Sequence, residues 1–403
     1  MKSVRSLIRF RRFEPDSRKR RLTRAADIED LRKIAKRRLP RGVFDYLEGG
    51  AEAEITAARN QREFGRLGFV PRVLRNMQDV DTSVEMFGVR WSIPLVLAPT
   101  GFTRIFDPQG ELAVARAAAK AGIPYTLSTL GTRSIEEVAA VSEGEKWFQV
   151  YVWRDRGLVV DMLARAEEAG YSTIVITVDT AVLGRRERDV RRGFSLPPKI
   201  GLDTIWDGIV HPRWTWGLIR GKPIRFANVR NEAVGDGSDP ISLAHYINTQ
   251  FDPSLSWDDI SWFRDTWPGN IVIKGIQSVA DAELAAASGV DAIALSNHGG
   301  RQLDGAPAAI ELVSPVAQAL GGEIPILCDG GVRRGSDIVK ATAMGATACM
   351  AGRAYLYGLG AGGELGVDHA LSLIADGVRR TMALAGYSSI GDLHPGMLQK
   401  FDG

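Results

Sequence analysis

The chain has 403 residues, of which 45% are hydrophobic and 25% charged, a composition typical of one large globular domain or two smaller ones. Its net charge of +3 is too small to indicate a nucleic-acid-binding protein. Much of the positive excess lies in residues 1–24, which contain no apolar stretch long enough for a signal peptide or a membrane span. We therefore expect a cytoplasmic protein with a basic N-terminal arm, either mobile or lying over the surface, followed by a single domain over residues 25–403.

The two cysteines, Cys328 and Cys349, both lie inside apolar runs that read as strands. Such positions are typical of buried thiols in a reducing compartment. We therefore predict neither a disulfide nor a metal site.

Two helices are predicted before the main repeat of the chain. Apolar residues recur at helical spacing over residues 25–38, and a second helix is expected between Pro40 and the Gly49-Gly50 stop. Neither belongs to the repeat, so we interpret both as lead-in helices.

From residue 93 onward the chain alternates buried strands, polar loops and amphipathic helices. Strands are predicted at residues 93–100, 125–128, 147–152, 173–179, 270–275, 291–296, 324–328 and 347–352. Helices are predicted between them, for example at residues 110–121, 157–169, 279–288 and 336–344. About eight such units in one continuous alternation favour an α/β fold of the (β/α)8 TIM-barrel type over an open, doubly wound sheet.

The interval between the fourth and fifth predicted strands is several times longer than a normal unit. It contains an insertion at about residues 188–256, parts of which are predicted to be loop because of Pro197-Pro198, Pro212 and the polar run 235–240. Tryptophans and basic residues are mixed in it: Trp206, Trp214 and Trp216 with Arg213, Arg220, Lys222 and Arg225. This mixture suits a membrane interface or a partner surface, and equally a lid on the barrel or a subunit contact.

The most informative stretch is Leu295-Ser296-Asn297-His298-Gly299-Gly300-Arg301-Gln302-Leu303-Asp304, which follows a predicted buried strand. In an α/β barrel the loops at that end of the strands carry the chemistry. His298 offers a proton acceptor and Arg301 an anion clamp. Taken alone, the pattern also fits a turn with a capping histidine and a solvated arginine.

A phosphate site is predicted on the loops after the last two strands. Asp329-Gly330-Gly331-Val332-Arg333 follows one of them and Gly352-Arg353 the other. Glycines let backbone N–H groups approach a phosphate, a helix N-terminus adds partial positive charge, and the two arginines would complete the cradle. Glycine patterns of dinucleotide and nucleoside triphosphate sites are absent from these loops, which weakens NAD and ATP as candidates.

Together these motifs resemble the FMN-dependent (S)-2-hydroxy acid oxidase and dehydrogenase family, over about residues 25–393. The resemblance implies an FMN cofactor, His298 as the base that takes a proton from the substrate, and Asp179 as the carboxylate that balances the imidazolium. It implies that Arg301 and Arg186 bind the substrate carboxylate in a forked geometry. It also implies that Tyr46 and Tyr151 donate hydrogen bonds to the substrate, and it leaves open whether hydrogen leaves C2 as a proton or as hydride.

For the cofactor, the resemblance implies that Lys274 stabilises negative charge on the reduced flavin. The other cofactor-binding positions that it implies are Pro99, Thr100, Gly101, Ser128, Gln149, Thr177, Ser296, Asp329, Gly330, Gly331, Arg333, Gly352 and Arg353. Each has an ordinary alternative as a core residue, cap or surface charge when taken singly. Independent accidents would, however, have to supply a base, its partner, two clamps and a flavin counter-charge.

Two departures from the family pattern bear on the subclass. Leu130 stands where the glycolate-oxidizing members carry a tryptophan, and Gly101 replaces an alanine of many members. Within the insertion, the residues around Trp214 and Trp257 resemble the membrane-associated bacterial L-lactate dehydrogenases. This favours a quinone or another respiratory acceptor over oxygen, and peripheral attachment to the cytoplasmic face of the membrane.

We therefore expect oxidation of a small (S)-2-hydroxy acid, L-lactate to pyruvate first, by a homo-oligomer, with a tetramer implied by the resemblance. The alternatives are an oxygen-using hydroxy acid oxidase or lactate 2-monooxygenase, and, more distantly, an FMN barrel isomerase acting on a phosphorylated substrate. A flavin-binding scaffold without turnover is the alternative from another class.

Overall fold

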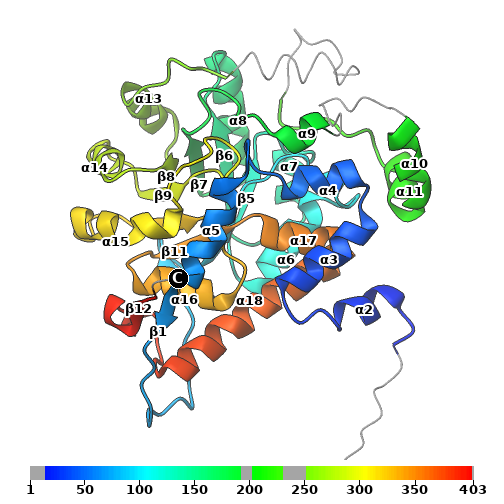
Figure 1. Ribbon diagram of the computed structural model, residues 1–403. Coiled ribbons are helices and arrows are strands. Elements are labelled where there is room, and N and C mark those ends of the chain that lie inside the picture. Colours follow the sequence, from blue (N-terminus) through cyan, green and yellow to red (C-terminus); the bar gives the residue numbers. More distant parts are fainter. Residues whose placement is uncertain (1–13, 192–201, 230–250, 402–403) are drawn as a thin grey trace, which may run out of the picture.

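The computed structural model describes residues 14–191, 202–229 and 251–401. Eight parallel strands form a closed barrel in chain order, with the last pairing back to the first (Figure 1). They are β4 (Leu95–Leu97), β5 (Tyr125–Ser128), β6 (Lys146–Tyr151), β7 (Thr173–Thr177), β8 (Asn270–Ile276), β9 (Ala292–Ser296), β10 (Ile326–Asp329) and β11 (Ala348–Ala351). The predicted (β/α)8 barrel is confirmed, although several strands are shorter than expected because their polar ends already belong to the loops that form the pocket described below.

Helices surround the barrel. They are α6 (Glu111–Ala121), α7 (Ile135–Ala139), α8 (Arg156–Glu168), α13 (Asp258–Thr266), α14 (Val279–Ala287), α15 (Ala309–Leu320), α16 (Gly335–Ala343), α17 (Arg353–Gly362) and α18 (Glu364–Ala385). Local sequence defines their ends: the Ser278 side chain accepts a hydrogen bond from the Asp281 amide at the start of α14, and Gly122 ends α6 in the left-handed region.

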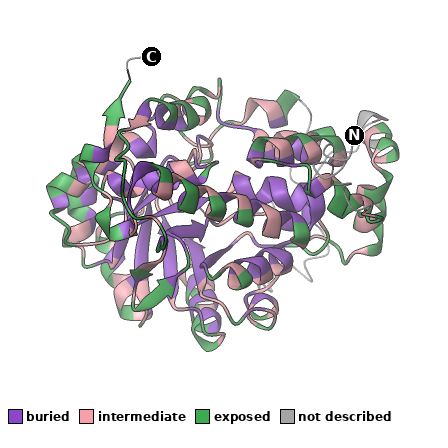
Figure 2. Cartoon of the chain, turned by 90° about the horizontal axis from the view of Figure 1, so that it is seen from below, coloured by how far each residue is buried: buried purple, intermediate pink, exposed green. Residues whose placement is uncertain are grey.

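The core has two parts, one inside the barrel and one between the strands and the helices (Figure 2). Inward-facing side chains of the strands include Val96, Trp147, Val175, Val272 and Leu327. The antiparallel hairpin β2 (Val84–Met86) and β3 (Val89–Trp91) adds Trp91, whose ring meets that of Trp147 at 5.7 Å. One end of the barrel interior is therefore filled by apolar side chains, and the polar chemistry gathers at the other.

The lead-in helices are α2 (Ser17–Leu22), α3 (Ile28–Arg38), α4 (Arg41–Glu48) and α5 (Ile55–Gly65). The two predicted helices correspond to α3 and α4. Residues 1–13 of the basic arm lie outside the described residues, whereas residues 17–22 form α2 and bury Leu22 against Gly362 of α17. That part of the arm is packed rather than mobile.

Small elements complete the described part of the fold. The antiparallel pair β1 (Leu67–Phe69) and β12 (Leu398–Lys400) joins the segment after α5 to the C-terminal segment. Single-turn helices occur at η1 (Thr103–Ile105), η3 (Ile390–Asp392) and η4 (Pro395–Met397).

The insertion leaves the barrel after β7, as expected, and its described parts are mainly helical. It contains α9 (Glu187–Arg191), α10 (Leu202–Val210) and α11 (Pro212–Arg220); the predicted loops at Pro197-Pro198 and residues 235–240 lie outside the described residues. Pro212 does not mark a loop: it occupies the first turn of α11, where its missing N–H costs nothing. The hairpin of α10 and α11 stands at the edge of the molecule (Figure 1).

Candidate active site

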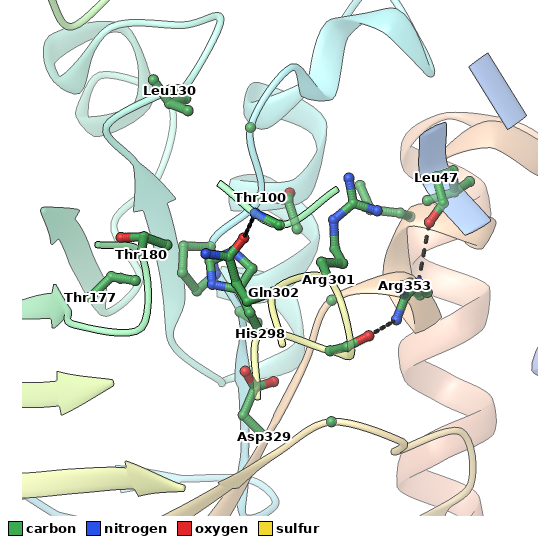
Figure 3. A pocket seen from close by; sticks show the side chains of 18 of the residues that line it. Leu47, Thr100, Leu130, Thr177, Thr180, His298, Arg301, Gln302, Asp329 and Arg353 are labelled. Atoms are coloured by element: carbon green, nitrogen blue, oxygen red, sulfur yellow. Dashed lines mark hydrogen bonds between the residues drawn. The ribbon is translucent and has the colours of Figure 1, made fainter. Parts of the chain in front are cut away.

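A pocket of about 440 Å³ opens at the carboxyl ends of the barrel strands (Figure 3). Its lining contains most of the predicted site residues: Tyr46, Pro99, Thr100, Gly101, Gln149, Tyr151, Thr177, Arg186, Lys274, His298, Arg301, Asp329, Gly330, Gly331, Arg333, Gly352 and Arg353. The remaining three, Ser128, Asp179 and Ser296, lie directly behind it and hydrogen-bond to lining residues. The barrel thus brings every predicted site residue to one place.

His298 and Asp179 form the central pair of the pocket. The Nδ1 atom of His298 lies 3.0 Å from Oδ1 of Asp179, which follows β7 by two residues. A β-carbon on Gly275 would lie 2.8 Å from that of Asp179, so the glycine permits this close approach. Burial alone would raise the pKa of Asp179, but His298 and Lys274 outweigh it and lower that pKa. The carboxylate is therefore kept ionised beside the imidazole.

Two guanidinium groups flank the ring of Tyr46. The central carbon of Arg301 lies 5.0 Å from the ring centroid and that of Arg186 lies 5.6 Å from it. Burial, reinforced by repulsion from Arg186, lowers the pKa of Arg301 to about 10. An anion bound between the two groups would relieve that repulsion, so the arrangement suits a carboxylate.

Asp189, on α9, is a pocket residue that the sequence did not reveal. Its Oδ2 lies 3.0 Å from Nε of Arg186, and burial raises its pKa although Arg186 and Arg301 oppose the shift. The chain spacing of Arg186 and Asp189 is that of an ordinary exposed helical pair, so no sequence signal distinguished it.

Lys274 is buried inside the barrel mouth, and its charge is balanced there. Its Nζ lies 2.8 Å from Oδ2 of Asp329 and donates to Oγ of Ser296 at 2.8 Å. Burial alone would lower the pKa of Lys274, but Asp329 and Asp179 raise it. The lysine therefore stays charged at the floor of the pocket.

Three neighbouring strand ends carry a connected polar row. Ser128 donates to Oε1 of Gln149 at 2.9 Å, and Nε2 of Gln149 donates to Oγ1 of Thr177 at 3.0 Å. Because the carboxyl ends of parallel strands meet at one rim, the row faces the same cavity. The strands thus present donors and acceptors suited to a planar heteroaromatic ring.

The glycine loop after β10 and the start of α17 form a positively charged corner. Gly330 and Gly331 have φ values of +118° and +89°, which side chains rarely adopt. Arg353 donates to the carbonyls of Leu47, Gly49 and Gly299. Burial lowers the pKa of Arg353, and the nearby charge of Arg333 lowers that pKa further. Two cations beside an uncapped helix start fit a phosphate group.

Part of the pocket wall is apolar, and the insertion supplies some of it. Phe226 stacks edge-on against Phe102 at 4.5 Å, and Phe251 against Tyr151 at 5.2 Å. Leu130 lies at the same wall. Phe226 and Phe251 were also missed by the sequence reasoning, because only the return of the insertion to the barrel places them there.

The fold and the pocket define an α/β barrel with a histidine–carboxylate pair and two neighbouring guanidinium groups at the carboxyl ends of its strands. Comparison with known proteins identifies the family: the model for FMN-dependent dehydrogenases matches residues 35–400. The L-lactate dehydrogenase of Caulobacter vibrioides is 43% identical over 370 residues, which cover 92% of this chain and 96% of that protein. The corresponding enzyme of Alcaligenes faecalis is 42% identical over 365 residues, covering 90% and 96%.

Solved structures of similar sequence also come from enzymes that oxidise 2-hydroxy acids. The structure of the monotopic membrane protein (S)-mandelate dehydrogenase is 41% identical, covers 94% of this chain and 100% of its own, and has a TM-score of 0.90. That of mandelate oxidase is 38% identical, with coverages of 94% and 99% and a TM-score of 0.80. The chain therefore belongs to the FMN-dependent dehydrogenase family and is an FMN-dependent enzyme of 2-hydroxy acid oxidation.

Among the described residues, no helix is long and apolar enough to cross a membrane. The same part of the chain holds no group of three or more His, Cys, Asp and Glu side chains arranged for a metal ion. Cys328 and Cys349 are both buried and free.

Proposed function

We propose that the chain oxidises L-lactate to pyruvate and passes the electrons to a quinone or another respiratory acceptor. The observation that carries the proposal is the His298–Asp179 pair, 3.0 Å apart, in the same pocket as the guanidinium groups of Arg186 and Arg301. A 2-hydroxy acid needs a base at C2 or its hydroxyl and a fixed carboxylate. This pocket offers both, and the curated relatives named above are L-lactate dehydrogenases.

In this proposal His298 accepts the proton, and Asp179 stabilises the imidazolium and fixes the ring. Arg186 and Arg301 bind the substrate carboxylate, while Tyr46 and Tyr151 orient it by hydrogen bonds. Both guanidinium carbons lie near the Tyr46 ring centroid, at 5.6 and 5.0 Å, so a carboxylate bound by them would also lie close to Tyr46.

FMN, when bound, supplies the acceptor for the two electrons. Lys274, with the Ser128–Gln149–Thr177 row, would contact its ring, and the backbone of Pro99, Thr100 and Gly101 would line the opposite wall. Ser296 and Asp329 orient Lys274, and Gly330, Gly331 and Gly352 with Arg333 and Arg353 would bind the phosphate.

Anaerobic mixing of the purified flavoprotein with L-lactate tests the proposal directly. The expected result is bleaching of the flavin absorbance by L-lactate and not by D-lactate. Retention of the oxidised spectrum with every (S)-2-hydroxy acid in a panel would overturn it. Under air, stoichiometric peroxide would instead favour an oxygen-using oxidase.

A bulkier aromatic 2-hydroxy acid is the second candidate substrate. The observation that favours it is the apolar wall of Phe102, Leu130, Phe226 and Phe251, which exceeds what a methyl group would cover. The same anaerobic panel, with (S)-mandelate included, ranks the two by the rate of bleaching at equal concentration.

We also propose that the hairpin of α10 and α11 lies on a membrane surface. Trp206 is 65% exposed and Trp216 is 56% exposed, and Ile209, Val210 and Ile219 are exposed beside them. Exposed apolar patches of this kind mark interaction sites, and amphipathic helices with tryptophan suit the headgroup region. The guanidinium carbon of Arg220 lies 4.1 Å from the Trp216 ring, which places a cation beside the indole as anionic lipid would require.

Trp214 differs from the other two tryptophans of the hairpin. It is partly buried and donates its indole N–H to the carbonyl of Ile105 at 2.7 Å. Arg104 donates to the carbonyls of Lys222 and Pro223, so the return of the hairpin is attached to the pocket wall. Within one segment, Trp206 and Trp216 therefore suit a membrane surface, whereas Trp214 holds the hairpin against the barrel as a lid would require.

A further inference from the structure

Two buried asparagines join the loop of residues 296–304, here called the catalytic loop, to the lead-in helices. Asn60 of α5 is 2% exposed and Asn297, beside His298, is 1% exposed. Their amides bond reciprocally: Nδ2 of Asn60 donates to Oδ1 of Asn297 at 2.8 Å, and Nδ2 of Asn297 donates to Oδ1 of Asn60 at 2.7 Å. The proposed function assigns neither residue a role.

The Asn297 amide is fixed in one orientation. Its Nδ2 also donates to the carbonyl of Pro307 at 2.8 Å, and its Oδ1 also accepts from the amide of Gly300 at 3.0 Å. A carbonyl only accepts and a backbone N–H only donates, so a flipped amide would face both with the wrong group. Asn60 must therefore offer its donor to Oδ1 and its acceptor to Nδ2.

His298 lies in the turn that the Asn297 amide closes. Its φ is +57°, a left-handed conformation that is uncommon for a residue with a side chain. Such a conformation persists only where the surroundings over-determine it. Here the Gly300 amide donates to both the carbonyl and the side chain of Asn297, and the His298 amide donates to Oγ of Ser296.

Asn60 also contacts the glycine loop after β10. A β-carbon on Gly331 would lie 2.0 Å from the backbone oxygen of Asn60, and one on Gly330 would lie 3.2 Å from its Nδ2. One residue of α5 therefore touches both the loop that carries His298 and the loop assigned to the phosphate. The distance between those loops depends on it.

We propose that Asn60 and Asn297 form a positioning pair that fixes His298 in its left-handed turn and sets the catalytic loop at a fixed distance from the glycine loop. The inference rests on the proposed role of His298 as the base. It predicts that disturbing the pair slows the step that needs His298 while the flavin and the substrate still bind.

The test is Asn60→Asp, measured as the rate of anaerobic flavin reduction across pH. The introduced carboxyl can donate to Oδ1 of Asn297 only when protonated; when ionised it places an oxygen against that oxygen in a buried site. At about pH 8 we expect a reduction rate about 10- to 100-fold below wild type, with the ratio recovering toward pH 5. Flavin content and the substrate concentration for half-maximal rate should change little.

The ionisable side chains on the elements packed around Asn60 already have hydrogen-bond or ion-pair partners. They are Arg59, Glu63, Asp304, Glu311, Asp329, Arg333 and Lys340. Burial and the Asn297 oxygen therefore dominate the introduced carboxyl and raise its folded-state pKa. Asn76→Asp, at an exposed position, is the matched control and should leave the pH profile unchanged.

Thermal unfolding supplies a second readout that does not depend on turnover. The folded-state pKa of the introduced carboxyl is raised. The free energy of unfolding of the variant should therefore be nearest to that of wild type below about pH 4, and it should fall as the pH rises toward that pKa. A uniform loss of stability at every pH, with the reduction rate unchanged, would reduce the pair to a packing role and overturn the proposal.

A double-mutant cycle compares Asn60→Ala, Asn297→Ala and the variant that carries both substitutions. Non-additive effects on the reduction rate are expected because the pair shares two hydrogen bonds. Additive effects would contradict the proposal. If wild type itself is not reduced by any 2-hydroxy acid, the proposed function fails; the pH dependence of unfolding then still reports on the pair, and its absence would refute the pairing separately.

Discussion

The catalytic loop (residues 296–304) and the hairpin of α10 and α11 differ in how their side chains are used. In the loop, Ser296 and Asn297 are buried, and the carbonyl of Gly299 and the guanidinium of Arg301 are bonded to other parts of the fold. In the hairpin, Trp206 and Trp216 are exposed, and attachment to the barrel involves a few contacts, such as Trp214 with Ile105.

This difference separates two physical tasks. The proposed base, His298, must be placed within a fraction of an ångström, which explains why its loop is bonded redundantly and tolerates strain at that residue. A surface that meets another phase needs exposed apolar area and basic charge, and it gains nothing from internal bonds. Substitutions in the loop should therefore slow flavin reduction, whereas substitutions on the outer face of the hairpin should weaken membrane binding.

The largest effect is expected for His298→Gln. The substitution removes the base but keeps a polar side chain of similar size, so FMN should stay bound while anaerobic flavin reduction falls about 10²- to 10⁴-fold. Stopped-flow absorbance measures both. More than about a tenth of the wild-type rate would remove His298 from the role of base.

Arg301→Lys should come next. The side chain keeps its charge but loses the planar guanidinium, whose Nη1 donates to the carbonyls of Tyr46 and Gly49 at 2.9 and 2.8 Å and whose other nitrogens could donate to a bound carboxylate. We expect a loss of about 10- to 100-fold in kcat/KM for reduction, consistent with loss of charge-assisted hydrogen bonds. Arg75→Lys, at an exposed position, is the control; equal kinetics for both variants would place Arg301 outside the site.

Arg333→Ala should affect the cofactor rather than the substrate. The Arg333 side chain donates to the carbonyl of Val332, whereas the Arg353 side chain donates to three carbonyls. Arg333→Ala should therefore weaken FMN retention with little loss of folding stability, and Arg353→Ala should reduce both. Flavin-to-protein ratio and thermal unfolding separate the two effects; retained flavin with weaker substrate binding would contradict the phosphate assignment.

The smallest effect on turnover is expected for Trp206→Ser combined with Trp216→Ser. Both indoles are exposed, so lactate-to-dye activity should remain within about twofold of wild type, because isolated surface changes cost little. Co-sedimentation with anionic vesicles and quinone reduction should fall, and wild-type binding should weaken with salt because basic residues contribute.

Trp214→Phe is the matched control for the hairpin, because it keeps the outer face and removes the bond to Ile105. It should retain vesicle binding. If the double variant loses dye activity as much as quinone activity, the outer face acts as a lid. Lack of vesicle binding by the intact protein would reject the membrane proposal outright.

The amino-acid sequence by itself determined the barrel and nearly all of the proposed site. Alternation of buried strands and amphipathic helices has few solutions other than a barrel, and loops after parallel strands must share one rim. For that reason His298, Arg333 and Arg353 could be expected at one rim from their positions after strand ends, whereas Ser128 was assigned to the site by the family resemblance.

Only the tertiary structure decided the rest. Asp189, Phe226 and Phe251 lie far along the chain from the motifs or at unremarkable spacing, and packing brings them to the pocket. Packing likewise brings Asn60 to Asn297, beside His298. Likewise Trp206, Trp214 and Trp216 look alike in sequence, whereas the fold partly buries Trp214 and exposes the other two. Local patterns specify which side chains an element presents, but which neighbour each side chain meets depends on how elements distant in sequence pack together.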